Sequence, residues 1–230
     1  MAKKNFVEKM FNDIAPTYDK LNHILSLNVD KSWRRKAVKR ICSTNPKHVL
    51  DIACGTGDFA IALAQAGVPK VTGVDISEGM LEVGRKKVKE LGLDIEMKVD
   101  DSECLSYEDN TFDAISVAFG VRNFEHLQEG LNEMNRVLRP GALVCIVELS
   151  VPSNPILLWG YKLYFLHLLP FIGGLISGNK DAYKYLPTSV LHFPKPEKVC
   201  EMLRTAGFEQ VEAKAFTFGL CRMFTGVKKG

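Results

Sequence analysis

The stretch HVLDIACGTGDFAIALAQAG, residues 48–67, decides the fold of this chain. It begins with a short apolar run, passes through a turn that contains Gly55 and Gly57, and ends in an alanine-rich segment closed by Gly67. This order predicts a buried strand, a tight glycine turn and a helix with glycine at its end. Such a unit typically opens an α/β sheet in which strands alternate with helices.

The chain repeats the alternation of strand and helix up to residue 150. Ser77 is a good N-terminal cap for the next helix, and Arg139-Pro140-Gly141 is a strong stop signal for the one after it. The predicted strands are 70–77, 94–101, 112–120 and 142–150, and the predicted helices are 78–92 and 125–138. Strands separated by helices in this way predict a parallel, doubly wound sheet.

After residue 190 the order of elements changes. A helix is predicted over 194–208, with Pro at its start and Gly near its end. The strands 209–219 and 220–229 follow each other so closely that only an antiparallel pair can join them. A mostly parallel sheet ending in an antiparallel hairpin is the arrangement of methyltransferases that use S-adenosylmethionine. We therefore predict an α/β fold of the Rossmann-like, class I methyltransferase type.

The 230 residues suit one domain with two additions. Residues 48–151 and 191–230 would form the Rossmann-like methyltransferase domain. Residues 1–47 look helical and amphipathic up to the Pro46 breaker, and we expect them to form a lid. The apolar, aromatic segment 152–190 is expected to be an insertion that caps the substrate.

The glycine turn carries a cofactor signature. DIACGTGDFA, residues 51–60, fits the pattern G-x-G-x-x-A, and Asp75 ends the second strand beyond it. The same spacing serves nicotinamide dinucleotides, so the pattern alone does not decide between the two cofactors.

Charge favours S-adenosylmethionine. A dinucleotide places its pyrophosphate at the helix N-terminus, but here Asp51 and Asp58 flank the turn and would repel it. The two acids suit a ligand that carries an ammonium and a sulfonium, although Asp58 alone is better explained as an N-terminal helix acid. Asp75 would bind the ribose diol, and Asp101 and Ser102 the adenine amino group. The predicted cofactor-binding residues are Asp51, Gly55, Thr56, Gly57, Asp75, Asp101 and Ser102.

Composition and charge give no sign of nucleic acid or metal as a partner. The chain is 46% hydrophobic and 25% charged, and its net charge of +3 is too small to indicate nucleic-acid binding. The six cysteines form no CxxC pair and have no metal-ligand spacing, so we expect reduced thiols, no metal and a cytoplasmic location. The charged N-terminal segment does not resemble a signal peptide.

One apolar run, residues 155–177, approaches the length of a membrane span. Lys162, His167, Pro170 and a Gly pair interrupt it, which disfavours insertion into lipid. We expect a cap that guides an apolar tail, with loose docking at the inner face of the membrane and a homodimer surface as open alternatives.

Several further motifs carry a family resemblance. Four motifs add to the cofactor loop: FNDIAPTYDKLNHILSLNVDKSWRRKA near the start, FGVRNF after the fourth strand, RVLRPGALVCIVELS around the fifth strand and YKYLPTSVLHFP in the insertion. With these motifs, the chain resembles the ubiquinone/menaquinone biosynthesis C-methyltransferases over nearly its full length. Three departures are Asn28 with Asp30, where the family usually has Gly and His, Ala142, where a second Gly is common after Pro140, and Ala118, where many members carry Ser. Asn28 still tolerates a left-handed backbone.

The resemblance implies methyl transfer from S-adenosylmethionine to a ring carbon of a polyprenylated hydroquinone, with the menaquinone branch favoured over the ubiquinone branch. A hydroquinol hydroxyl has a pKa near about 10, like tyrosine, so a base or a cationic group must help to form the phenolate. We expect Arg122 to supply the charge and Asn123 to hold a water or the second hydroxyl. The structural alternatives are that Arg122 pairs with a carboxylate and that Asn123 caps the helix from Phe124.

The remaining candidates support these two residues. Tyr18 and Asp19 are expected in the lid over the cofactor. The residues expected to face the substrate are Tyr18, Tyr183, Tyr185 and Ser189. His192 is a candidate base, and Glu148 is expected either as a base or as a partner of Arg122.

Three other functions stay open at this point. The chain could methylate a ubiquinone-branch benzoquinol or another aromatic or lipid acceptor with a reshaped insertion. It could be an NAD(P)-dependent oxidoreductase on the same kind of sheet. A non-catalytic module would bind the cofactor without turning over an acceptor.

Overall fold

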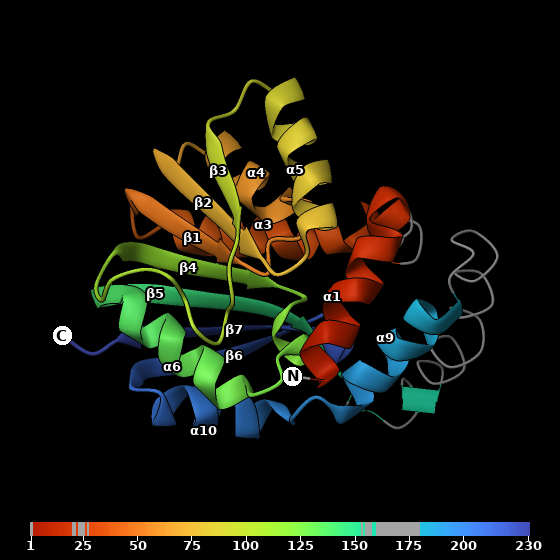
Figure 1. The fold of residues 1–230 in the computed structure, drawn as a ribbon. Coiled ribbons are helices and arrows are strands. Elements are labelled where there is room, and N and C mark those ends of the chain that lie inside the picture. Colours follow the sequence, from red (N-terminus) through yellow and green to blue (C-terminus); the bar gives the residue numbers. More distant parts are fainter. Residues whose placement is uncertain are drawn as a thin grey trace.

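The fold is a seven-stranded sheet with helices on both faces (Figure 1). The computed structural model describes residues 2–19, 22, 26, 28–152, 154, 158–159 and 180–230. The strands are β1 (His48–Ile52), β2 (Lys70–Asp75), β3 (Ile95–Val99), β4 (Phe112–Ala118), β5 (Leu138–Leu149), β6 (Phe208–Phe216) and β7 (Cys221–Lys228). Their order across the sheet is β3-β2-β1-β4-β5-β7-β6. The first five pair in parallel, and β7 lies antiparallel between β5 and β6, which confirms the predicted fold class.

Helices cover both faces of the sheet and reach across its edge. They are α1 (Ala2–Ile14), α3 (Val29–Cys42), α4 (Asp58–Gln65), α5 (Glu78–Glu90), α6 (Leu127–Val137), α9 (Lys180–His192) and α10 (Pro196–Thr205). α3 and α4 lie on one face, and α6 and α10 lie on the other (Figure 1). α1 and α9 lie beyond the ends of the strands, on the side to which β4 and β5 point (Figure 1).

The strand β1 shows why this sequence builds a central strand. Val49 faces the apolar cluster beneath α3 and α4, whereas Leu50 and Ile52 face the cluster beneath α6 and α10. All three side chains are fully buried, because a strand covered by helices on both faces must be apolar on both. Asp51 is the exception within this run, and it lies at the site described below.

The structure corrects several predicted boundaries. The helix expected over 125–138 is α6, which begins only at Leu127 with His126 before it and no side-chain cap, so Asn123 does not cap it. Arg139-Pro140-Gly141 does not lie in a loop but in the first part of β5, because the strand starts at the residue that follows α6. The hairpin is joined by a short 3-10 turn, Thr217–Gly219, rather than at a single pair of residues.

Two smaller sequence predictions are confirmed. The backbone of Asn28 is left-handed, with φ of 59°, as expected for an Asn in place of Gly before α3. The hydroxyl of Ser77 caps α5 by accepting a hydrogen bond from Met80 N at 3.2 Å. Asp30, one of the departures from the family pattern named above, is buried and accepts hydrogen bonds from Ser26 and Arg34.

The helix α1 is fastened to α5 by a contact that the sequence did not reveal. The side-chain oxygen Oδ1 of Asn12 accepts hydrogen bonds from Ser77 Oγ at 2.7 Å and from Gly79 N at 2.9 Å. One of the free N–H groups at the start of α5 is therefore satisfied by a residue 67 positions earlier in the chain. A second attachment is the edge-to-face contact of Phe6 with Tyr185 on α9, at 5.6 Å between ring centres.

The substitution Asn12→Ala tests this attachment. It removes both hydrogen bonds, and we expect the free energy of unfolding to fall by about 1–2 kcal/mol. Limited proteolysis should also cut within α1 sooner in the variant. Asn5→Ala is the matched control, since Asn5 is an exposed residue of the same helix. Equal stability of the two variants would show that Asn12 does not hold α1.

Candidate active site

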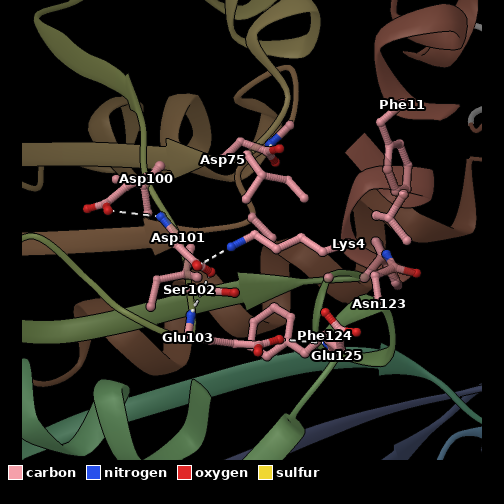
Figure 2. A pocket seen from close by; sticks show the side chains of 18 of the residues that line it. Lys4, Phe11, Asp75, Asp100, Asp101, Ser102, Glu103, Asn123, Phe124 and Glu125 are labelled. Atoms are coloured by element: carbon pink, nitrogen blue, oxygen red, sulfur yellow. Dashed lines mark hydrogen bonds and ion pairs between the residues drawn. The ribbon is translucent and has the colours of Figure 1, made fainter. Parts of the chain in front are cut away.

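A cavity opens at the carboxyl ends of β1, β2 and β4 (Figure 2). Its empty space, with the open mouth included, is about 690 Å³. One wall is the glycine turn with the end of β2, another is the segment that follows β3, and a third is the exit of β4. Lys4, Val7 and Phe11 of α1 close it from above the strand ends.

The glycine turn needs its small residues. Ala53, Gly55 and Gly57 all have left-handed backbones, with φ of 51°, 55° and 82°, which explains the glycines but makes Ala53 strained. A Cβ on Gly120, at the exit of β4, would lie 2.5 Å from the Cβ of Ala53. The two loops that form the floor of the cavity can approach this closely only because one of them carries a glycine.

Asp75 ties the end of β2 to the glycine turn. Its Oδ2 accepts a hydrogen bond from Gly55 N at 2.8 Å, and its Oδ1 accepts one from Ser77 N at 2.9 Å. Burial raises the pKa of Asp75, and the backbone N–H groups oppose that shift. The carboxylate lines the cavity, so its remaining lone pairs can accept hydrogen bonds from ligand hydroxyls.

Asp101 and Ser102 line the opposite wall, in the segment that follows β3. Lys4 extends from α1 across the cavity and forms an ion pair with Asp101 (Figure 2). The other oxygen of Asp101 accepts a hydrogen bond from Glu103 N at 3.1 Å. No periodicity or motif pointed to Lys4, because its partner lies 97 residues further along the chain.

Asp51 and Thr56 are close to the turn but face away from the cavity. Ser116 Oγ donates a hydrogen bond of 2.6 Å to Asp51 Oδ1, and within the described residues the buried Oδ2 has no hydrogen-bond partner. Burial raises the pKa of Asp51 to about 7, against the opposing effects of the Ser116 hydrogen bond and the charge of Arg34. Thr56 is buried, and its hydroxyl donates to Asp19 at 2.5 Å.

Lys87 joins three segments beside the glycine turn. Its ammonium lies 2.7 Å from Asp19 Oδ2 and 2.5 Å from Asp58 Oδ1. Asp58 is the first residue of α4 and also pairs with Arg34 at 3.4 Å, which agrees with the prediction of a helix-start acid. Lys87 therefore connects the residues after α1, the start of α4 and α5, and its pKa is raised by the two carboxylates against the effect of burial.

Arg122 is held in a buried ion pair at the ends of β4 and β5. Its Nη1 lies 2.8 Å from Glu148 Oε1, and the two side chains are 6% and 0% exposed. Nη1 also donates to the carbonyl of Phe119, and Nε donates to Ser189 Oγ at 3.3 Å. The pairing with a carboxylate that the sequence left open is thus present. Burial raises the pKa of Glu148, and Arg122 opposes that shift.

Asn123 and Tyr185 meet between the cavity and α9. Asn123 lines the cavity, and its Oδ1 accepts a hydrogen bond of 3.3 Å from the hydroxyl of Tyr185. Tyr18 lines the same cavity. Its pKa is raised by burial, and the positive charge of Arg122 lowers it in part. Arg122, Asn123, Tyr18, Tyr185 and Ser189 thus lie in one continuous region.

Three other residues were singled out in the sequence: His192, Tyr183 and Ala118. His192 is exposed at the end of α9, and its Nδ1 lies 2.8 Å from the carbonyl of Thr188. Tyr183 belongs to α9, but its side chain lies outside the described residues. Ala118, where many relatives have Ser, lines the cavity, so a hydroxyl at this position would face the ligand.

The fold and the acids at the strand ends define a class I methyltransferase type of protein. The solved structure of the cyclase SpnF matches with a TM-score of 0.73 over 97% of this chain and 95% of that chain, at 16% identity. A methyltransferase from Thermotoga maritima matches with a TM-score of 0.69 over 96% and 99%, at 20% identity. At such identities these likenesses concern the fold alone.

Sequence comparison identifies the family. A model of the ubiE/COQ5 methyltransferase family matches residues 1–228, and the chain belongs to this family. The demethylmenaquinone methyltransferase of Bacteroides fragilis is 44% identical over 98% of this chain and 94% of the relative. The enzyme of the same name from Deinococcus radiodurans is 44% identical over 99% and 94%. The predicted family and the predicted enzyme class, a methyltransferase, are confirmed.

None of the helices in the described ranges has the length and apolar character needed to cross a membrane. The apolar run 155–177, which approaches the length of a membrane span, lies largely outside those ranges.

The substitution Lys87→Met should loosen the connection between Asp19 and Asp58. The two carboxylates would lose their shared cation, and we expect the free energy of unfolding to fall by about 1–3 kcal/mol. Lys86→Met is the matched control, because Lys86 is the exposed neighbour on the same helix. If chemical denaturation shows the same small change for both variants, Lys87 does not join these segments.

Asp51 predicts a specific pH dependence of stability. Its folded pKa of about 7 lies above the ordinary value of 3.8, so the folded state holds the proton more tightly. Below about pH 4 Asp51 is protonated in both the folded and the unfolded state, and its burial causes no loss of stability. Between about pH 4 and 7 the unfolded state loses the proton first, so the free energy of unfolding falls, and above about pH 7 the loss is complete. Asp51→Asn should gain stability over the natural protein across this window, by on the order of 4 kcal/mol.

Asp113→Asn gives the opposite sign and serves as the control. The pKa of Asp113 is lowered by hydrogen bonds from His48 N and Arg139, against the effect of burial. Its ionised form therefore stabilises the fold at neutral pH, and that stabilisation is lost as the pH falls through its lowered pKa. Denaturation curves from pH 4 to 8 measure the change for Asp51→Asn, and curves extended to about pH 2 measure the loss for Asp113. A pH-independent difference for Asp51→Asn would contradict the burial argument.

Proposed function

We propose that this protein transfers a methyl group from S-adenosylmethionine to a ring carbon of a polyprenylated hydroquinone. The observation that carries the proposal is a juxtaposition: Asp75, Asp101 and Asn123 line one cavity, and the buried Arg122–Glu148 pair adjoins Asn123. The first part has the groups for a nucleoside, and the second has the cation for a phenolate.

The cavity fits the donor by the chemistry of its walls. Asp75 offers acceptors to a ribose diol, and Asp101 with Ser102 offers acceptors to an adenine amino group. The left-handed backbone of Gly55 allows close approach of a ligand. Asp51 lies beside the turn without lining the cavity, and in its ionised form it would disfavour a pyrophosphate at the turn. When bound, S-adenosylmethionine supplies a methyl group activated by its sulfonium.

Arg122 is the group that stabilises the phenolate. Nε and Nη1 are engaged with Ser189, Phe119 and Glu148, and in the described part of the chain no partner is found for Nη2. A hydrogen bond from Nη2 to an acceptor oxygen would lower its pKa from about 10 and raise the electron density of the ring. Glu148 fixes the orientation of the guanidinium, so the charge is in place before the acceptor arrives.

Asn123 and Tyr185 would hold the other side of the acceptor. Their hydrogen bond fixes the carboxamide of Asn123, whose N–H₂ can then donate to the second ring oxygen or to a water that removes the proton. Tyr18 lies between this region and Asp75, and would separate the ring from solvent. The face of α1 that lines the cavity supports the role of residues 1–47 as a lid, and 152–190 would cap the tail.

The menaquinone branch is the acceptor that the relatives favour. Proteins from Bacteroides fragilis and Deinococcus radiodurans at 44% identity are named demethylmenaquinone methyltransferases. A relative from Geobacter sulfurreducens, also 44% identical, carries a name that includes both ubiquinone and menaquinone biosynthesis. We therefore take demethylmenaquinol as the acceptor and a ubiquinone-branch benzoquinol as the alternative.

A labelled methyl donor tests the proposal directly. The protein is incubated with S-adenosylmethionine that carries a labelled methyl group and with a panel of reduced quinones. Label in the ring of menaquinol is the expected result. Label only in a benzoquinol product would assign the other branch. Stabilisation by NADH with none by S-adenosylmethionine would overturn the proposal.

Arg122→Lys should lower kcat for methyl transfer by about 10²–10³-fold, since one fixed donor to a developing charge is lost. The dissociation constant for S-adenosylmethionine should stay within about twofold, because Arg122 does not line the donor walls. Arg139→Lys is the matched control, as Arg139 pairs with Asp113 at the other end of the strands. Full activity of Arg122→Lys would remove Arg122 from the mechanism.

A further inference from the structure

The turn between β6 and β7 holds an aromatic ring in solvent. Thr217, Phe218 and Gly219 have three successive left-handed backbones, with φ of 45°, 56° and 91°. This conformation is unfavourable for a β-branched residue and for a bulky aromatic one. Phe218 is nevertheless 80% exposed, the largest exposed fraction among the large apolar side chains that the structure describes. Backbone strain is therefore accepted without burial of the ring.

Hydrogen bonds from two other elements keep the turn in this shape. The indole Nε1 of Trp33 on α3 donates to Thr217 Oγ1 at 2.9 Å. Ser150, which follows β5, donates from its hydroxyl to the carbonyl of Gly219 at 2.7 Å and from its N–H to Leu220 at 3.0 Å. The backbone of the turn that carries Phe218 is thus held by the fold.

The turn lies at the same edge of the sheet as the active site. Cys221 at the start of β7 is paired with Leu149 at the end of β5, and Arg222 is paired with Glu148, the partner of Arg122. Pro152, at the start of the apolar segment, lies against the turn, since a Cβ on Gly219 would be 3.6 Å from its Cα. The turn that carries the exposed ring therefore lies at the edge of the sheet where Glu148 pairs with Arg122.

The helix beside the turn is strongly basic. α3 contains six Lys or Arg residues and one acid, Asp30. It begins at the active-site edge, because Trp33 contacts Phe119 just after β4, at 6.2 Å between ring centres. Lys36 lies over the ring of Phe216, immediately before the turn, at 4.8 Å. The exposed basic residues of this helix are Lys31, Arg35, Lys36 and Lys39.

We propose that the Phe218 turn and the basic face of α3 dock on a lipid bilayer that carries anionic phospholipids. An aromatic ring can enter the interface between headgroups and acyl chains, while Lys and Arg are attracted to the negative surface. This inference rests on the proposed function, because a polyprenylated acceptor resides in the bilayer and must reach Arg122 from there. Docking at this edge brings the acceptor region to the source of the acceptor.

The chemistry of the surface favours a bilayer over a second protein. A stable protein interface buries about 800 Å² on each partner and has an apolar centre depleted in charge. Here a single ring is flanked by a helix whose exposed residues are mostly cationic. The ring would enter the boundary between headgroups and acyl chains, and the cations would stay at the charged membrane surface.

Vesicle sedimentation with the full chain tests the proposal. We expect binding to vesicles of phosphatidylcholine mixed with phosphatidylglycerol, much weaker binding to phosphatidylcholine alone, and loss of binding at high salt. Phe218→Asn keeps the left-handed turn, since Asn tolerates it, and should weaken binding by about tenfold. The double variant Lys31→Glu/Arg35→Glu should weaken it by at least about tenfold.

Matched control variants distinguish binding through this surface from non-specific binding to vesicles. Leu91→Ala removes an exposed apolar residue just after α5, and Lys89→Glu reverses a charge on that helix. Neither variant should change vesicle binding. Phe218→Asn should also keep full activity on a water-soluble, short-tailed quinol and lose activity on a long-tailed acceptor embedded in vesicles.

Each result has a defined meaning. Equal vesicle binding by the natural protein and Phe218→Asn, or no binding to either kind of vesicle, overturns the docking surface. So does a change from dimer to monomer in Phe218→Asn without any effect on vesicles, because the ring would then bind a second copy. Specific vesicle binding without methyl transfer to any quinol would support the surface and refute the proposed function instead.

Discussion

The carboxylate of Asp75 is the interaction on which the candidate site depends. It accepts one backbone N–H from Gly55 in the glycine turn, 20 residues earlier in the chain, and another from Ser77, just before α5, so a single side chain fixes two loops. Because both N–H groups point at the same carboxylate, the cavity floor is defined before any ligand binds. The helices α4 and α5 then leave this floor in fixed directions.

Local patterns predicted the sheet well. The apolar runs of β1, β2, β4 and β5 are buried on both faces, and such strands leave a clear signal in the sequence. Glycine positions and the Ser77 cap have short-range causes and were also predictable. The start of α6 was not predictable, because no side chain caps it and the preceding 3-10 turn uses residues that would suit a helix equally well.

Long-range side-chain contacts were the part of the site that the sequence could not supply. These contacts join residues from 29 to 97 positions apart. Asn12 of α1 binds the start of α5, Lys4 pairs with Asp101, and Lys87 lies between Asp19 and Asp58. Periodicity reports which face of an element is buried, but not which partner a polar group meets across the fold. The sequence named Arg122 and Glu148 as a conceivable pair only because both end neighbouring strands.

The attachment of α1 has a consequence for the exchange of ligands. The helix is bonded at Asn12 to α5, near Tyr185 through Phe6, and across the cavity through Lys4, while its apolar face forms one wall of that cavity. A molecule in the cavity and the attached helix therefore share one surface. The attached helix strengthens the binding of any molecule that it contacts in the cavity. By thermodynamic reciprocity, that molecule strengthens the attachment of the helix by the same free energy. A change that loosens this single N-terminal helix would therefore also weaken the binding of any molecule that contacts it in the cavity.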